Sequence, residues 1–305
     1  MFRQTNRNLL AWGGLTFLYA LLIVVLPENT QSIAQYHLSH NQYRLLTLLL
    51  SVPLFAIWFA AFYGYSALME YVETIQESRE ATGLLRLSHA ARWLAWGQPG
   101  LSILSLTLYS VANRHSGFLT AAIIIINYTG LLISLFAFSA AHDGARQLIA
   151  QTRLRMPPTA AKTLQLLFVS LGVAYCYIVF RYANLQSFGN SNNPFRLPLW
   201  LLVTTLLIPY LYAWFVGLVA VYDIAIVAKG TKGVLYRQAL SLLSSGFGVV
   251  IASSIISQYL YMALPRYGQL LFGRIFLAYL VLFFFAVGFT MIALGAKRLK
   301  KIEDI

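Results

Sequence analysis

Long runs of apolar residues recur along the whole chain and limit its fold more than any other feature. Each run holds roughly 17 or more residues with few charges, enough to cross about 30 Å of hydrocarbon as an α-helix. Of the 305 residues only 10% are charged and 59% are hydrophobic, whereas about 25% are charged in an ordinary soluble domain. We therefore expect an all-α integral membrane protein with eight transmembrane helices, at 9–26, 45–67, 93–111, 118–141, 164–180, 197–222, 239–260 and 275–296.

Lys and Arg residues are distributed unevenly between the two ends of these runs. With a cytoplasmic N-terminus, sixteen of the 22 lie on the cytoplasmic side and six at the outer ends. Cytoplasmic segments of membrane proteins carry such an excess. We expect a multi-pass protein of the inner (cytoplasmic) membrane with both termini in the cytoplasm.

The formal net charge of +13 has a related explanation. The basic residues lie in short segments between apolar runs, where they interact with anionic lipid headgroups. Nucleic-acid binding would need them gathered on one folded aqueous face. We therefore expect membrane lipids as partners, and no nucleic acid.

The second half of the sequence repeats features of the first. Pro53 matches Pro209 and Trp58 matches Trp214, and the matches keep their order at an offset of about 151 to 156 residues. The segment 144–148 likewise matches 295–299. We predict two four-helix repeats, residues 1–155 and 156–305. Four is an even number, so both repeats have the same orientation and are related by a pseudo-two-fold axis along the membrane normal.

Motifs of soluble enzymes are absent from the sequence. It has no Gly-rich phosphate loop, no His-Glu-x-x-His and no paired cysteines, since Cys176 is the only cysteine. The five histidines lie in loops or at helix ends, where solvation is a commoner role than metal or haem ligation. We expect a protein that is not an enzyme, and nothing in the sequence identifies a cofactor.

A few polar residues fall inside or at the edges of the apolar runs. Asp143, Asp223 and Glu70 lie near inner helix ends, and His142 lies beside Asp143. Ionisable groups in a membrane are costly and suggest function, but a carboxylate within a turn or two of the interface can also reach water. Asn127 lies near the middle of a span, where hydrogen bonding between helices is its expected role.

Small residues follow helical spacing in two of the runs. Ser241, Ser245, Gly248 and Ala252 share one face of 239–260, and Gly97, Gly100, Ser102 and Ser105 occupy the equivalent run 93–111. Small faces permit close helix contact. We predict that these two helices pack centrally on their small faces, with a polar-lined pathway between them as the alternative.

Four carboxylates follow the second run at spacings of three, four and three. If the helix of that run continues into the cytoplasm, Glu70, Glu73, Glu77 and Glu80 lie on one stripe of it. A solvated face partly neutralised by Arg and Lys is the commoner role of such a stripe. The alternative is a docking surface for a partner or a cation site.

Two functions fit this architecture. The first is a membrane protein that binds or transports a small or lipidic ligand between its two halves. The second is a non-catalytic accessory or scaffold subunit, or a sensor component, of a larger membrane complex, because the loops leave no room for a soluble domain.

Overall fold

The computed structural model describes residues 2–26, 39–75, 79–112, 119–152, 166, 199–231, 233–267 and 271–303. These residues contain α-helices and no β-strand, so the all-helical expectation is confirmed for the described part. The helices are α1 (Phe2–Val25), α3 (His40–Thr74), α4 (Arg79–Ala112), α5 (Leu119–Thr152), α8 (Leu199–Gly230), α9 (Val234–Tyr267) and α10 (Leu271–Glu303).

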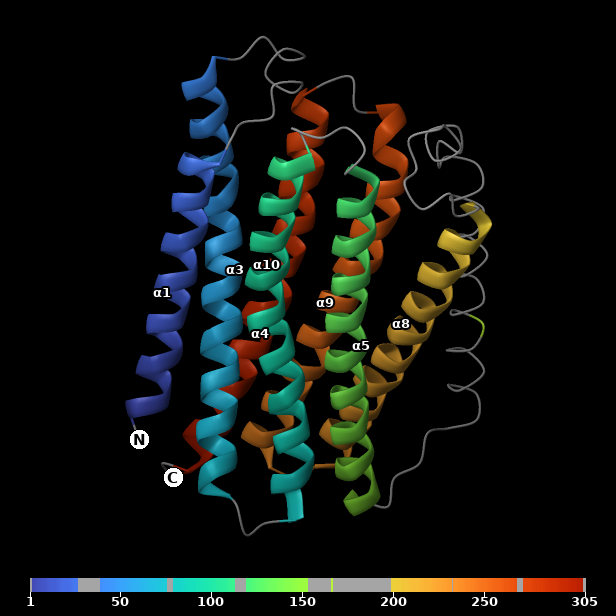
Figure 1. The fold of residues 1–305 in the computed structure, drawn as a ribbon. Helices are drawn as coiled ribbons and strands as arrows, with labels where there is room; N and C mark the ends of the chain where they lie inside the picture. Colours follow the sequence, from blue (N-terminus) through green and yellow to red (C-terminus); the bar gives the residue numbers. More distant parts are fainter. Residues whose placement is uncertain are drawn as a thin grey trace.

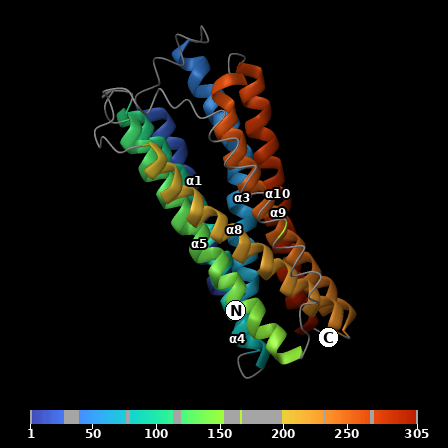
Figure 2. The same ribbon diagram turned by 90° about the vertical axis from the view of Figure 1, so that its right-hand side faces the viewer.

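The helices run up and down in one bundle of two layers. Figure 1 shows α3, α4 and α5 in front and α10, α9 and α8 behind them, and Figure 2 shows the same bundle from the side. The first residues of α1 and the last residues of α10 lie at the same end. We call this end the basic end, because the described parts of α4, α5, α8, α9 and α10 place most of their Lys and Arg residues there.

Six of the helices form a closed ring. Contacts run in the order α3, α4, α5, α8, α9 and α10, and α10 packs against α3 to complete the circle. α1 lies outside the ring and packs on α3. The N-terminal and C-terminal halves of the chain therefore meet at two seams, α5 with α8 and α10 with α3.

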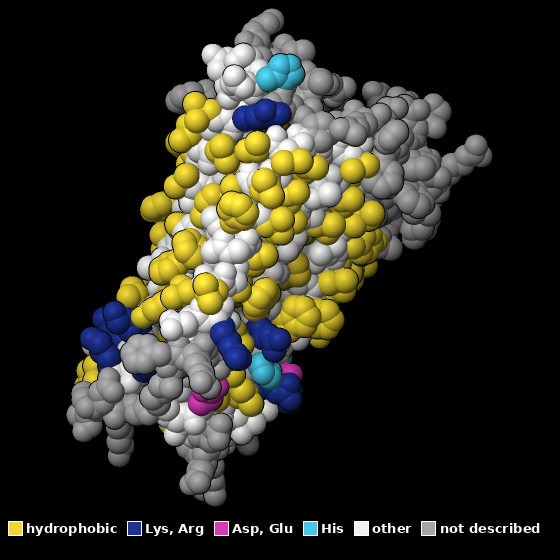
Figure 3. Space-filling view, turned by 60° about the vertical axis from the view of Figure 1, so that its left-hand side comes forward, with side chains coloured by type: hydrophobic (Ala, Val, Ile, Leu, Met, Phe, Trp, Pro, Cys, Tyr) yellow, Lys and Arg dark blue, Asp and Glu magenta, His cyan; other side chains and the backbone are white. Residues whose placement is uncertain are grey.

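Most of the described helices are long and apolar enough to cross a membrane. Stretches of α1, α3, α5, α8, α9 and α10 meet this condition by length and composition, which supports a multi-pass membrane protein. α4 is less apolar, because its middle carries Gln98 and Pro99 between two glycines. A broad hydrophobic belt covers the middle of the bundle, and Lys and Arg side chains gather beyond it at the basic end (Figure 3). This distribution fits a hydrocarbon layer with water at its boundaries.

Large side chains fill the interior of the bundle. One continuous hydrophobic cluster includes residues from both halves of the chain. Trp58 of α3 and Trp214 of α8 are 0% and 1% exposed, although each lies on a helix with a lipid-facing side. The largest fully buried side chains also include Phe62, Phe138, Phe247 and Phe289.

Glycines bring two helix pairs into close contact. A Cβ added to Gly144 of α5 would lie 2.7 Å from the Gly83 carbonyl oxygen of α4. A Cβ on Gly295 of α10 would lie 2.9 Å from the Ala239 carbonyl oxygen of α9. Neither position has room for a side chain, so glycine is what lets these backbones approach.

The helices extend further than the apolar runs predicted. α3 begins at His40 and ends at Thr74, whereas its apolar run covers only 45–67. Polar residues start the helix: the Ser39 side chain accepts from the Gln42 backbone N–H, and the Gln42 side chain accepts from the Ser39 backbone, as in a capping box. The fifth predicted run, 164–180, lies outside the described residues apart from Leu166.

The predicted orientation of the small-residue face on α9 is wrong. Ser241, Ser245 and Ala252 are exposed, and Gly248 is only half-buried. The small residues that face neighbouring helices are Ser244, whose Oγ donates to the Val221 carbonyl oxygen of α8, and Gly246, which packs on Gly288 of α10.

The corresponding expectation for α4 also differs from the structure. Gly100 is exposed with nothing near its missing side chain, while Gly97 packs tightly against Ile133 of α5. α4 and α9 make their main contacts with adjacent members of the ring and not with each other. The two helices are therefore ring members, and neither forms a centre around which the others pack.

Candidate functional site

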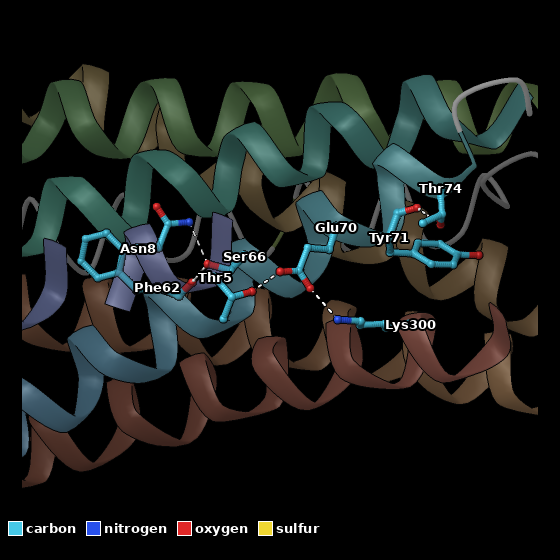
Figure 4. A network of polar contacts seen from close by, with 8 residues as sticks. All are labelled: Thr5, Asn8, Phe62, Ser66, Glu70, Tyr71, Thr74 and Lys300. Atoms are coloured by element: carbon cyan, nitrogen blue, oxygen red, sulfur yellow. Dashed lines mark hydrogen bonds and ion pairs between the residues drawn. The ribbon is translucent and has the colours of Figure 1, made fainter. Parts of the chain in front are cut away.

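Polar side chains gather near the basic end at both seams between the halves of the chain. At the α3–α10 seam the central group is Glu70, which is 5% exposed. Its carboxylate accepts hydrogen bonds from the Thr5 hydroxyl of α1 and from Lys300 Nζ of α10, the latter at 2.6 Å (Figure 4). One buried carboxylate therefore joins three helices.

A second polar contact lies one turn further along α3, where α1 packs on it. Asn8 Nδ2 donates to Ser66 Oγ at 2.8 Å, and Ser66 Oγ donates to the Phe62 carbonyl oxygen (Figure 4). Beyond these, Trp12 Nε1 donates to the Phe55 carbonyl oxygen at 3.0 Å. Hydrogen bonds between membrane helices contribute roughly 0.6 kcal/mol each on average. Together these contacts fix the register of α1 on α3.

The α5–α8 seam brings Asp223, which was predicted from the sequence, near Arg146 of α5, the helix that also carries the predicted His142 and Asp143. Asp223 of α8 is 7% exposed, and the Arg146 guanidinium of α5 lies near enough to act on its charge. His142 lies one turn before Arg146 and is close to both Arg146 and Asp143. Asp143 itself is exposed. The seam thus holds a carboxylate, a guanidinium and an imidazole within one or two helical turns.

The two seams differ in how far their polar groups are satisfied. Glu70 has two donors, whereas the described residues place no hydrogen-bond donor on Asp223. The His142 Nδ1 atom is also buried without a hydrogen-bond partner among the described residues. Buried polar groups without partners are costly, so native structures usually supply a partner or use the group. The α5–α8 seam is therefore the stronger candidate for a functional site.

Tyrosine hydroxyls cross both seams farther from the basic end. Tyr210 of α8 donates to the Asn127 carbonyl oxygen of α5 at 3.1 Å, and Tyr279 of α10 donates to the Leu49 carbonyl oxygen of α3 at 3.1 Å. Asn127 is half-buried at this contact. Its backbone carbonyl therefore takes part in a bond between helices, the kind of contact expected of its side chain.

The predicted carboxylate stripe does not form one continuous face. α3 ends at Thr74 and α4 begins at Arg79, so Glu80 lies on a different helix from Glu70. Glu70 is buried and paired, Glu73 is exposed, and Glu77 lies outside the described residues. The helix expected to carry the stripe stops because the chain turns back here to pack α4 beside α3.

The first turn of α4 contributes a contact to the other layer. Glu80 lies beside the Tyr236 hydroxyl of α9, and Tyr71 of α3 lies near the same hydroxyl. The Tyr236 hydroxyl is buried near both side chains, without a hydrogen bond to any described residue. The contact places Glu80 in a packing role between the two layers, although its own side chain remains exposed.

The histidines lie apart from one another in the described part of the chain. His40 begins α3, His89 lies near the start of α4 and His142 lies in α5; His37 and His115 are outside the described residues. Burial lowers the pKa of His89, and the nearby Arg86 and Arg92 guanidinium groups lower it further. Among the described residues no three His, Cys, Asp or Glu side chains gather as a metal site would require.

Sequence reasoning missed the cations that complete these sites. It used Arg146 and Lys300 only to assign orientation, although each faces a buried carboxylate. A buried acid in a membrane span needs a compensating cation, so Glu70 and Asp223 in the apolar runs each indicate a basic partner nearby. The spacing could not identify the partner, because Lys300 is 230 residues from Glu70.

Comparison of the sequence with protein-family models finds no match, and comparisons with curated proteins and with solved structures find no significant similarity.

Proposed function

We propose that this chain is a non-enzymatic membrane protein that binds or transports a small or lipidic ligand at the contact between its two halves, specifically at the α5–α8 seam. The observation that carries the proposal is Asp223, a carboxylate inside a membrane-spanning segment to which the described residues supply no hydrogen bond. Intramembrane ionisable residues mark ligand and ion pathways more often than they stabilise a fold. A ligand that donates a hydrogen bond to Asp223 would remove the cost of its burial.

Paired contacts in the two halves support the duplication on which the ligand site depends. Gly144 packs against Gly83 and Leu87 of α4, and Gly295 packs against Ala239 and Leu243 of α9. Each residue of the second set follows its counterpart by about 151 to 156 positions, the offset seen in the sequence. The buried Trp58 and Trp214 are another such pair. Two equivalent halves closing a ring create two equivalent seams.

The eight-span topology is part of the same proposal. α5 ends at the basic end, and α8 begins at the opposite end of the bundle (Figure 1). We infer that the chain between Thr152 and Leu199 returns across the thickness of the bundle. The apolar run 164–180 in this segment is long enough to span the membrane. α4 lies between α3 and α5 along its length, so we infer that it crosses as well.

The orientation follows from the charge distribution. The basic end would face the cytoplasm of a cell with an inner membrane, because Lys and Arg are enriched on that side. Both termini would then be cytoplasmic, and the Asp223 site would open toward the cytoplasmic leaflet.

Mass spectrometry of retained ligands tests this proposal. Wild type, Asp223→Asn and Asp143→Asn are purified in parallel, and the small molecules and lipids that remain bound are extracted and identified. Asp143 is a matched control, because it is a carboxylate at the same end of the bundle but is exposed. We expect a species that is retained by wild type and Asp143→Asn and lost from Asp223→Asn. Equal retention by all three, or no retained species in wild type, contradicts the proposal.

A second function is favoured by the outer surface of α4 and α5. Trp93 stacks on Phe136 with ring centroids 4.8 Å apart, yet the two side chains are 44% and 49% exposed, and Trp96 nearby is 43% exposed. Tryptophan and phenylalanine are enriched in protein interfaces. As an accessory subunit, the chain would use this surface to contact a partner's helices. Purification at native abundance distinguishes the functions: stable co-purifying subunits that are lost on Trp93→Ala favour the accessory role.

A further inference from the structure

An open pocket of about 550 Å³ lies at the basic end between the ends of α8, α9 and α10. It is lined by side chains of three kinds, and no Asp or Glu is among them. The cations are Lys229, Arg237 and Arg298, the neutral polar residues are Gln238 and Ser241, and the apolar residues are Ala225, Ala228 and Leu242.

No carboxylate among the described residues compensates the positive charge of this pocket. Arg298 Nη1 donates to Gln238 Oε1 at 3.0 Å, which holds the guanidinium at the pocket. Within the described chain none of the three cations of the pocket has a carboxylate partner; Glu70 is paired with Lys300 instead. Asp223 lies on the opposite side of α8 from Ala225, since two residues correspond to about 200° of rotation. Three like charges around one hollow repel each other, and an anion would relieve that repulsion.

The pocket is also amphipathic along the bundle axis. Ala225 and Leu242 lie farther inside the spanning segments of α8 and α9, whereas Lys229 and Arg237 lie close to the ends of those segments. Ser241, at the inner wall, begins the strip of small exposed residues on α9 that continues with Ser245 and Ala252. A ligand in this pocket would therefore meet cations at the interface and an uncharged helix surface toward the hydrocarbon.

We propose that this pocket binds the phosphate of an anionic phospholipid headgroup, with the acyl chains lying along the small-residue face of α9. Arg and Lys bind phosphate through charge-assisted hydrogen bonds, and basic pockets between membrane helices suit anionic headgroups. The arrangement explains why Ser241, Ser245 and Ala252 face outward. It is independent of the α5–α8 seam, because it uses the other side of α8.

Native mass spectrometry in defined lipid tests this assignment. Wild-type protein is released from nanodiscs of phosphatidylcholine with or without phosphatidylglycerol, and retained phosphatidylglycerol is counted. The pocket variant is Lys229→Gln, Arg237→Gln and Arg298→Gln combined. The control variant neutralises three exposed cations of the same end that lie outside the pocket, Arg86→Gln, Arg92→Gln and Lys297→Gln. Thermal unfolding of each variant shows that it is folded.

Wild type and the control variant should retain phosphatidylglycerol, and the pocket variant should bind it about a hundredfold more weakly, since each cation contributes about a fivefold factor near an anionic surface. Equal losses of phosphatidylglycerol binding in both variants would show that the effect comes from general surface charge, and would overturn the proposal. Competition by water-soluble glycerol phosphate as effective as that by the lipid would assign the pocket to a free phosphate, and would overturn the lipid assignment.

Discussion

Glu70 of α3 and Lys300 of α10 form an ion pair at 2.6 Å although 230 residues separate them. The two partners are unequally buried: Glu70 is 5% exposed, whereas the Lys300 side chain is 42% exposed. The carboxylate depends on the pair for charge compensation, but the ammonium retains access to water. This asymmetry makes the cost of losing one partner different from the cost of losing the other.

We expect Lys300→Met to destabilise the protein more than Glu70→Gln. Removing Lys300 leaves a buried carboxylate with only the Thr5 hydroxyl, at a cost of roughly 1 to 3 kcal/mol. Removing the charge of Glu70 leaves an ammonium that water can solvate, at a cost of roughly 0 to 1 kcal/mol. Thermal unfolding in detergent measures both, with Lys301→Met as the exposed control. The reverse order of stabilities would show that Glu70 does not depend on Lys300.

Alanine at Gly144 or Gly295 should separate helix pairs that are now in close contact. The added methyl would lie 2.7 Å or 2.9 Å from a carbonyl oxygen of the neighbouring helix, and overpacking of this kind costs roughly 1 to 3 kcal/mol. Gly100→Ala is the matched control, since nothing lies near its missing side chain. Because Gly100 is helical, its replacement should be neutral or stabilising. Unfolding temperatures of the three variants test this, and equal effects at all three positions would contradict the packing described.

Adjacent serines on α9 should respond differently to the same substitution. Ser244→Leu should destabilise the bundle, because Ser244 is buried and its hydroxyl donates to α8 at 2.7 Å. Ser245→Leu should stay within about 0.5 kcal/mol of wild type, because that side chain is exposed. Yield and unfolding temperature in detergent provide the comparison. A destabilised Ser245→Leu with a stable Ser244→Leu would show that the face of α9 predicted from the sequence is the buried one.

Stability should fall as the pH drops below about 6.5, and His89 should account for part of the fall. Its pKa in the folded protein lies below the ordinary value of 6.5 because of burial and then of Arg86 and Arg92. Between the two pKa values the unfolded chain binds a proton that the folded chain does not, so folding is weakened there. His89→Asn should weaken the dependence of the unfolding temperature on pH in this range. If the unfolding temperature of His89→Asn depends on pH as that of wild type does, His89 is excluded as a source of the stability loss at low pH.

Within the described residues the sequence predicted the helices well, because apolar runs in lipid have few alternatives. Runs such as 45–67 and 239–260 lie inside α3 and α9. It did not predict which face of α9 is buried. Two overlapping sets of small residues run along this helix, and only tertiary contacts distinguish them. Ser244 and Gly246 belong to the buried set, and Ser241 and Ser245 to the exposed set.

The candidate site was predicted in part. His142, Asp143 and Asp223 were identified individually because polar groups are rare in apolar runs. The approach of Asp223 to Arg146 could not be derived, because it depends on α5 packing beside α8. The carboxylate stripe failed for a similar reason, since helical spacing was extended across the turn between α3 and α4.

Reporter fusions distinguish an eight-span bundle with equivalent halves from a bundle that lacks a crossing between α5 and α8. Fusions after Gln151 and after Gly230 should both report the cytoplasm, and a fusion after Asn190 should report the opposite side. This result would require a crossing between the end of α5 and the start of α8, which lie toward opposite ends of the bundle (Figure 1). Reporters after Gln151 and Asn190 on the same side of the membrane would contradict the eight-span account.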